Sequence, residues 1–87
     1  MHFNNIEDLS DKEIQKFYLQ IGKNVAKMRK EKGLSQLELA LMLGYKSSSQ
    51  ISGSEICYKN YHFNIEQLFK ISFLFKVDIS EFFKTTN

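Results

Sequence analysis

The sequence predicts an all-helical protein with five helices, on the basis of its composition and of the spacing of its apolar residues. The 87 residues are 43% apolar and 25% charged, which is the balance of an ordinary soluble globular domain. The chain contains no proline, four glycines and no long run of alternating β-branched residues, which favours helices joined by short turns. This length gives room for one hydrophobic core, so we expect a single domain whose partners bind on its outer surface.

The first helix is predicted to begin after Ser10 and to end near Lys32. Glu13 follows Ser10 by three residues, which is the pattern of a capping box. Gly33 supplies a residue that readily takes the left-handed conformation that ends a helix. The apolar residues between these points recur three and four positions apart, so they share one helical face. They are Ile14, Phe17, Tyr18, Ile21, Val25 and Met28.

A second and a third helix are predicted close together in the middle of the chain. Ser35 and Glu38 form another capping box, and the helix that they open runs into Gly44. Ser47 and Gln50 repeat the pattern and open a helix through about Ile56. The connection between the two helices is then three or four residues long, which holds them at a steep angle in a helix-turn-helix arrangement.

Two more helices are predicted in the last third of the chain, after an irregular loop over residues 57–63. Asn64 caps the fourth helix, and Asp78 with Glu81 forms the capping pattern of a short fifth helix that contains Phe82 and Phe83. The residues of the fourth helix that we expect to face inward are Ile65, Leu68, Phe69, Ile71, Ser72 and Phe75.

No group of residues in the sequence predicts catalysis, a metal site or a cofactor. His2 and His62 are isolated, and Cys57, the single cysteine, has no neighbouring histidine or second cysteine. We therefore expect a protein that is not an enzyme. Its apolar stretches are too short for a membrane span, and its acidic N-terminal residues do not resemble a signal peptide, so we expect a cytoplasmic location.

Basic residues are concentrated in one short segment, although the formal net charge is only +2. Residues 23–32 contain five basic residues and one acidic residue, whereas residues 1–22 contain two basic and four acidic residues. A basic segment on a helix is either a solvated face or a contact surface for a polyanion such as DNA.

A set of residues between Ile21 and Phe83 resembles, in order and spacing, the phage-repressor (Cro/cI-type) helix-turn-helix domain of the xenobiotic-response-element (XRE) family. The resemblance implies a lambda-repressor-like, DNA-binding fold over residues 21–84, with the helix-turn-helix at about residues 35–56. Residues 1–20 form an N-terminal extension that lengthens the first helix. The matching residues are Ile21-Gly22, Met28-Arg29-Lys30, Gly33-Leu34-Ser35-Gln36, Glu38-Leu39-Ala40, Leu43-Gly44, Ile51-Ser52, Glu55, Leu68, Ile71, Val77 and Phe82.

The resemblance implies that the third helix, at about residues 47–56, enters the major groove of double-stranded DNA. If Ile51 lies at the centre of the buried face, the side chains of Ser49, Ser52 and Ile56 and the backbone of Gly53 point away from the core. The expected DNA-contacting residues are Gln36, Lys46, Ser47, Ser48, Ser49, Gln50, Ser52, Gly53, Lys59 and Asn60.

Three of the expected contacts have a stated role. Gln50 either binds an adenine edge through two hydrogen bonds or folds back to cap its own helix. Gln36 matches the family position that contacts a phosphate, and Lys46 is expected to contact another. Arg29 and Glu55 match a family pair that joins the first helix to the third, so we expect an ion pair there.

Two departures from the family pattern concern the segments that flank the third helix. The segment between Gly44 and Ile51 is one residue longer than the commonest pattern, which shifts the expected base contacts by up to one position. Ile56 and Cys57 stand where the family often has a glycine, so the pattern leaves the shape of the loop after the third helix open.

The leading functional hypothesis is a sequence-specific transcriptional regulator, most simply a repressor, that binds DNA as a homodimer. We expect apolar residues of the N-terminal extension or of the last helix to form the dimer surface; they are Phe3, Ile6, Leu9, Phe82 and Phe83. The alternative is a protein-interaction adaptor, or an antitoxin that neutralises a toxin, on the same fold. Serines and glycine on the third helix and exposed tyrosines favour this alternative; the tyrosines are Tyr45, Tyr58 and Tyr61.

Overall fold

The computed structural model describes residues 3–85, and in this part of the chain every regular element is a helix. Its four α-helices are α1 (Asp11–Glu31), α2 (Gln36–Met42), α3 (Ser49–Ile56) and α4 (Ile65–Phe75). Its three 3₁₀ helices are η1 (Ile6–Asp8), η2 (Tyr58–Asn60) and η3 (Ile79–Phe83). The all-helical prediction is confirmed, and the prediction of five α-helices is wrong because the last one is a 3₁₀ helix.

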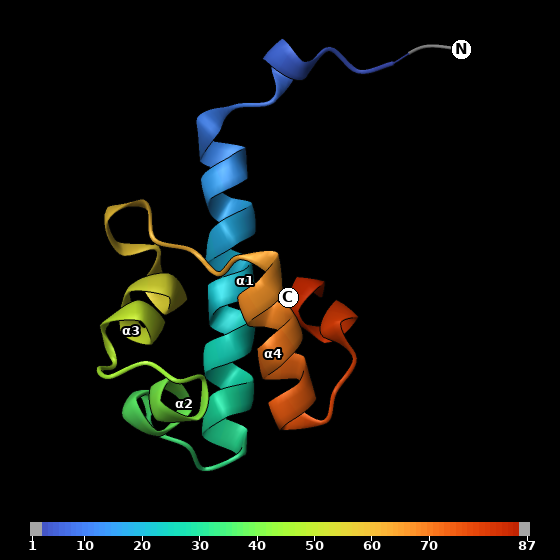
Figure 1. Cartoon of the computed structure of the whole chain (residues 1–87). Coiled ribbons are helices and arrows are strands. Elements are labelled where there is room, and N and C mark those ends of the chain that lie inside the picture. Colours follow the sequence, from blue (N-terminus) through green and yellow to red (C-terminus); the bar gives the residue numbers. More distant parts are fainter. Residues whose placement is uncertain (1–2, 86–87) are drawn as a thin grey trace.

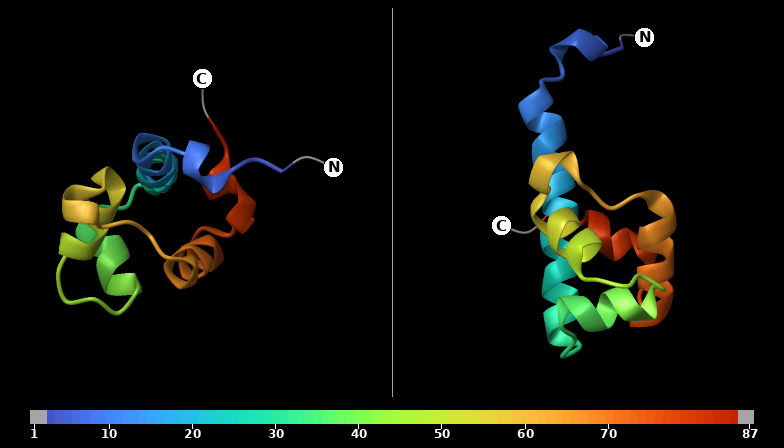
Figure 2. Two further views of the ribbon diagram at one scale, coloured as in Figure 1. Left: turned by 90° about the horizontal axis from the view of Figure 1, so that it is seen from above. Right: turned by 60° about the vertical axis from the view of Figure 1, so that its left-hand side comes forward.

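The long helix α1 is the central element against which the other elements pack. Helices α2 and α3 lie on one side of it, and α4 with η3 lies on the other (Figure 1). The view from above shows the same arrangement, with α3 and α4 separated across the core (Figure 2). The first turns of α1 extend beyond the other helices, and the segment that contains η1 continues away from the core (Figure 1).

A single apolar core lies between α1, α2, α3, α4 and η3. Phe82 is fully buried, and its ring packs edge-on against the ring of Phe75 with 6.4 Å between centroids. Phe82 is therefore excluded from the dimer surface that the sequence predicted for the last helix. The buried apolar residues of this core are Ile21, Val25, Leu39, Ala40, Ile51, Phe63, Leu68, Ile71, Phe75 and Phe82.

Three helices begin at the caps that the sequence predicted. The Ser10–Glu13 and Ser35–Glu38 capping boxes are both present, and Asn64 caps α4. Hydrogen bonds from Ser35, first of all from its backbone N–H, lower the pKa of the Glu38 carboxyl. Glu38 is therefore charged at neutral pH, and its stabilising contribution is lost only as the pH falls through this lowered pKa.

Helix α3 begins one residue later than the predicted capping box requires. Its N-cap is Ser48, which has a helical backbone conformation and makes no side-chain cap hydrogen bond. The hydroxyl of Ser47 lies 2.7 Å from that of Ser49 instead of accepting from Gln50. Helix α2 also ends early, at Met42, so the connection comprises residues 43–48 and is longer than the predicted three or four residues.

The outward faces of α1 and α4 contain apolar residues that we expected to face inward. On α4, Ile65 and Phe69 are 68% and 66% exposed, whereas Leu68 and Phe75 are buried. The core contacts only one side of α4, so apolar residues spread around more than half of the helix cannot all reach it. On α1, Ile14 and Phe17 are 40% and 53% exposed, and Phe17 stacks on the ring of Phe83, with 6.3 Å between centroids.

The last helical segment is short because its backbone carbonyls bond to α1. Asn24, a buried residue of α1, donates hydrogen bonds from Nδ2 to the carbonyl oxygens of Phe82 and Lys84, at 2.9 and 2.7 Å. The Asp78 side chain accepts from the backbone N–H of Ser80 rather than from Glu81. These bonds fix residues 79–83 as one tight turn against α1.

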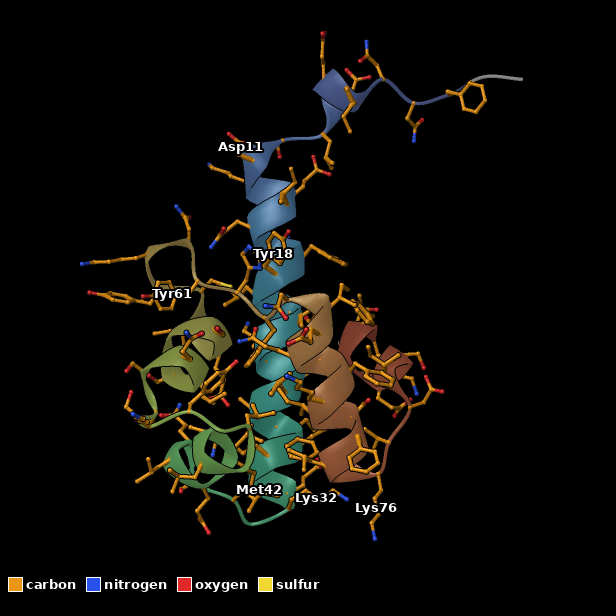
Figure 3. The ribbon with its side chains drawn as sticks, in the orientation of Figure 1. Asp11, Tyr18, Lys32, Met42, Tyr61 and Lys76 are labelled. Atoms are coloured by element: carbon orange, nitrogen blue, oxygen red, sulfur yellow. The ribbon has the colours of Figure 1, made fainter. Side chains whose placement is uncertain are left out.

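Replacing Lys76 by glycine should stabilise the protein. Lys76 ends α4 with φ at +57°, a conformation that costs an ordinary residue about 1 kcal/mol and that glycine adopts freely. It is exposed and lies at the lower end of α4 in Figure 3. We expect the melting temperature of Lys76→Gly to rise by about 4–8 °C, measured by circular dichroism. Lys76→Ala is the control: it removes the same charge but keeps the unfavourable φ, and an equal rise in both variants would contradict the explanation.

Candidate nucleic-acid interface

The outer face of α3 is polar at its start and apolar at its end. Ser49 and Gln50 are exposed in the first turn, Ser52 is half-buried, and Ile56 in the last turn is 66% exposed. Among residues 3–85, no partner bonds to the Gln50 amide, so the alternative in which Gln50 caps its own helix is wrong. The amide is free to donate and accept hydrogen bonds at the surface of the molecule.

Gly53 does not belong to the outer face, contrary to the geometric expectation. It is buried, and a Cβ atom added to it would lie 2.8 Å from Cδ2 of the Tyr61 ring. Tyr61 folds back over the end of α3 from the loop that follows, as Figure 3 shows. An advance of 100° per residue shows only that Gly53 faces away from the core. It takes no account of Tyr61, which lies eight residues further along the chain and covers Gly53 with its ring.

A buried carboxylate holds α3 in place from its inner side. Glu55 Oε2 accepts a hydrogen bond from Arg29 Nε at 2.8 Å, and Glu55 Oε1 accepts one from Arg29 Nη2 at 3.2 Å. The two residues are 6% and 4% exposed. The expected ion pair between α1 and α3 is thus present in a two-pronged geometry. Arg29 also donates from Nη1 to the carbonyl oxygen of Leu34 at 2.7 Å, which fixes the turn before α2.

Gln36 belongs to the same buried cluster in this structure. Its Nε2 donates to Oε1 of Glu55 at 2.8 Å, and the residue is only partly exposed. The resemblance implied a phosphate contact for Gln36, but here the side chain links α2 to α3. The Glu55 carboxylate therefore holds α3 to both α1 and α2.

The close packing of α1 on α3 depends on a small residue that the sequence analysis gave no such role. A Cβ atom on Gly22 would lie 2.4 Å from the carbonyl oxygen of Glu55 and 2.8 Å from that of Ser54. Only a residue without a side chain lets the two backbones approach this closely. The one signal in the sequence was a glycine in the middle of a helix, where it costs about 1 kcal/mol relative to alanine.

The loop after α3 contains three residues with unusual backbone geometry. Cys57, Lys59 and Asn60 all have positive φ, at 56°, 48° and 65°. Cys57 ends α3 in the left-handed conformation that a glycine usually supplies at this place. Its side chain is buried, and burial raises the pKa of the thiol, so it stays protonated at neutral pH.

Two ring contacts position this loop. The ring of His62 stacks on the ring of Tyr18 in α1, with centroids 3.9 Å apart, and anchors the end of the loop. The Lys59 ammonium lies 5.4 Å from the centre of the Tyr58 ring. Lys59 and Asn60 are both exposed beside α3. The loop that the sequence left without a regular structure is therefore a well-defined turn.

A shallow hollow of about 380 Å³ lies between the outer face of α3 and this loop. It combines hydroxyl groups, one positive charge and aromatic or aliphatic surface, so it can receive a flat or methyl-bearing group and an anion next to it. Its lining residues are Ser49, Ser52, Gly53, Ile56, Tyr58, Lys59 and Tyr61.

The remaining predicted site residues lie at the edges of this face. Lys46 is exposed in the connection between α2 and α3, Ser47 is exposed next to it, and Ser48 is half-buried at the start of α3. The basic segment at residues 23–32 is divided: Arg29 is buried in the ion pair, and its lysines are exposed along α1. The lysines of that segment therefore belong to α1 and not to the face formed by α3.

Other kinds of site find no support in the described residues. Residues 3–85 contain no group of three or more histidine, cysteine or carboxylate side chains that could hold a metal ion. No helix in this range is long and apolar enough to cross a bilayer.

Comparison of the chain with protein-family models, with curated proteins and with solved structures gives no match.

Proposed function

We propose that the protein binds double-stranded DNA by inserting α3 into the major groove. On this proposal it is a sequence-specific transcriptional regulator of the helix-turn-helix type, most simply a repressor, that acts as a symmetric dimer. One observation carries the proposal. The inner side of α3 is fixed by a buried charged group. Its outer side offers the Gln50 amide, which has no partner among the described residues, and the exposed Ser49 hydroxyl, which bonds only to that of Ser47; both lie between exposed Lys46 and Lys59. A rigid helix that presents hydrogen-bonding groups between two cations suits recognition of bases between phosphates.

The hollow beside α3 adds a preference for one kind of base. Ile56 and the tyrosine rings supply apolar surface next to the Ser49 and Ser52 hydroxyls. Apolar side chains in the major groove contact the methyl group of thymine, and serine bonds to several base edges. We therefore expect the bound sequences to be rich in A·T pairs, with adenine opposite Gln50.

The decisive test of groove insertion is Ser49→Glu. Ser49 is exposed, so a carboxylate there leaves the core intact but places a negative charge against the phosphates. We expect binding to DNA fragments selected from a random pool to fall below detection in a fluorescence-anisotropy titration. Ser80→Glu is the matched control, because it adds the same charge to η3, on the other side of α1 in Figure 1. Undiminished binding by a folded Ser49→Glu protein would reject the proposal.

Base recognition and phosphate contact should separate in a second pair of variants. Gln50→Ala should weaken binding by about 1–3 kcal/mol at the preferred sequence and relax the preference at one base pair. Lys46→Ala should weaken binding to all sequences alike and reduce the slope of log K against log salt by about one, because one counterion fewer is released. Titrations of both variants at several salt concentrations measure this, and a uniform loss for Gln50→Ala would argue against base contact.

The alternative of a protein-interaction adaptor or an antitoxin retains one specific observation in its favour. Phe69 and Phe73 on α4 are 66% and 79% exposed, and a partner protein could cover them. Of the tyrosines that suggested an adhesive surface, Tyr45 is only partly exposed and its hydroxyl accepts a hydrogen bond from Gln67, so it is not available. Unimpaired DNA binding by Ser49→Glu would promote this second candidate.

A further inference from the structure

Helix α4 carries an apolar stripe that no part of residues 3–85 covers. Ile65, Phe69 and Phe73 are 68%, 66% and 79% exposed. They are spaced four residues apart, so they lie in one line along the outer side of the helix. Exposed single apolar residues are ordinary, but an aligned set on a helix whose other side is already buried in the core is a second contact face.

The stripe continues onto the end of α2. A hollow of about 310 Å³ lies between the two helices, and its lining includes Met42 as well as Phe69 and Phe73. With roughly 150–250 Å² for each aromatic side chain, the two phenylalanines expose on the order of 300 Å². Ile65 and Met42 bring the apolar patch to on the order of 500 Å², which is at the upper end of what monomeric soluble proteins expose.

We propose that this face binds a second copy of the chain, with the two α4 helices packed antiparallel across a twofold axis at Phe69. Phe69 lies four residues from each end of the stripe. In an antiparallel pair the two copies of Phe69 therefore meet at the axis, and Ile65 of each copy meets Phe73 of the other. An isologous dimer requires such a self-complementary face, because the same surface is used by both copies.

The charges beside the stripe are also self-complementary. Glu66 and Lys70 lie on one flank of the stripe, toward α2, where the Lys70 ammonium is 3.0 Å from the Glu66 carboxylate. When two such helices run antiparallel, this flank faces its own copy, and Glu66 of one chain comes beside Lys70 of the other. Each Lys70 then lies between two carboxylates, and although the two lysines also meet near the axis, the four charges sum to zero.

The area and rigidity of the patch also favour a second copy at this face. Two copies of the apolar patch bury on the order of 1,000 Å² together, which reaches the lower limit of specific protein interfaces and suits a reversible dimer. Phe3 and Ile6 of the N-terminal extension are also exposed, but their segment projects away from the core (Figure 1) and would have to be ordered on binding. The role of the dimer, which is to place two α3 helices on DNA, rests on the proposed function. The formation of the dimer through α4 does not depend on that function.

Sedimentation of the full chain at micromolar concentration tests the surface. We expect a dimer for the wild type and a monomer for Phe69→Glu, because that variant places two carboxylates together at the axis. Phe17→Glu is the matched control: Phe17 is a phenylalanine of α1 that is 53% exposed and stacks on Phe83 rather than belonging to the α4 stripe, so this variant should remain a dimer. Circular dichroism verifies that both variants fold. A monomeric wild type, a dimeric Phe69→Glu, or a dimer lost in Phe17→Glu would each overturn the proposal.

Disulfide cross-linking tests the antiparallel arrangement without destabilising the face. After incubation with oxidised glutathione, we expect Phe69→Cys to link to itself. Ile65→Cys and Phe73→Cys should link only when the two proteins are mixed. The wild type is the background control, since its Cys57 is buried. Self-links of Ile65→Cys and of Phe73→Cys would indicate parallel helices, and the absence of every link would mean no α4 contact; both results contradict the proposal.

The failure of this inference and the failure of the proposed function are distinguishable. If both hold, Phe69→Glu should be a monomer that still binds DNA, more weakly than the wild type, whereas Ser49→Glu should be a dimer that does not bind DNA. A dimer that never binds DNA would reject the function and leave the interface standing. A monomeric wild type that binds DNA would do the reverse.

Discussion

Replacing Glu55 by alanine should lower the free energy of unfolding by about 3–5 kcal/mol and the melting temperature by tens of degrees. Within residues 3–85, Glu55 is the only acceptor for Nε and Nη2 of Arg29 and for the Gln36 amide, so the substitution leaves the Arg29 charge buried without its partner. Because the total stability of a chain of this size is about 4–13 kcal/mol, we expect a protein that is partly unfolded at 37 °C. Urea denaturation followed by circular dichroism measures the loss.

An exposed ion pair and a double variant provide the controls for this result. Glu66→Ala removes the partner of Lys70 at the surface, where both groups are solvated, and should cost less than about 0.5 kcal/mol. Arg29→Met combined with Glu55→Ala should recover part of the stability lost in Glu55→Ala alone, because no uncompensated charge remains buried. Equal losses of stability in Glu55→Ala and Glu66→Ala would contradict the conclusion that a buried ion pair holds α1 to α3.

Replacing Gly22 by alanine should destabilise the protein at the contact between α1 and α3, although alanine is the better helix former by about 1 kcal/mol. The added methyl group would lie 2.4 Å from the carbonyl oxygen of Glu55, which is backbone and cannot turn away. The two helices must separate, which strains the Arg29–Glu55 pair and exposes core surface. Overpacking of a core costs about 1–3 kcal/mol and more when backbone must move, so we expect a net loss of about 2 kcal/mol or more.

Thermal denaturation of Gly22→Ala beside Lys23→Ala measures this effect. Lys23 is the next residue, it is exposed, and its replacement should change the stability by less than about 0.5 kcal/mol. A Gly22→Ala protein as stable as the wild type would show that α1 and α3 do not approach as closely as described. Since α3 carries the proposed recognition groups, Gly22→Ala should also weaken DNA binding.

The candidate site was predictable only in part. The resemblance indicated the Arg29–Glu55 pair correctly, and the helical periodicity around Ile51 indicated the outward position of Ser49. Neither indicated that Gln36 bonds to Glu55 or that Tyr61 covers Gly53. These contacts join residues whose approach depends on how the helices cross and on the shape of the loop after α3.

By itself the sequence determined that the chain is helical and where three of its helices begin. The caps at Ser10, Ser35 and Asn64 were predictable because a capping box involves only residues within three positions of each other. Only the tertiary structure decided which apolar side of α4 is buried and that residues 79–83 form a 3₁₀ turn. Both depend on distant contacts: the bond from Asn24 to the carbonyl of Phe82 joins residues 58 positions apart, and no local pattern contains it.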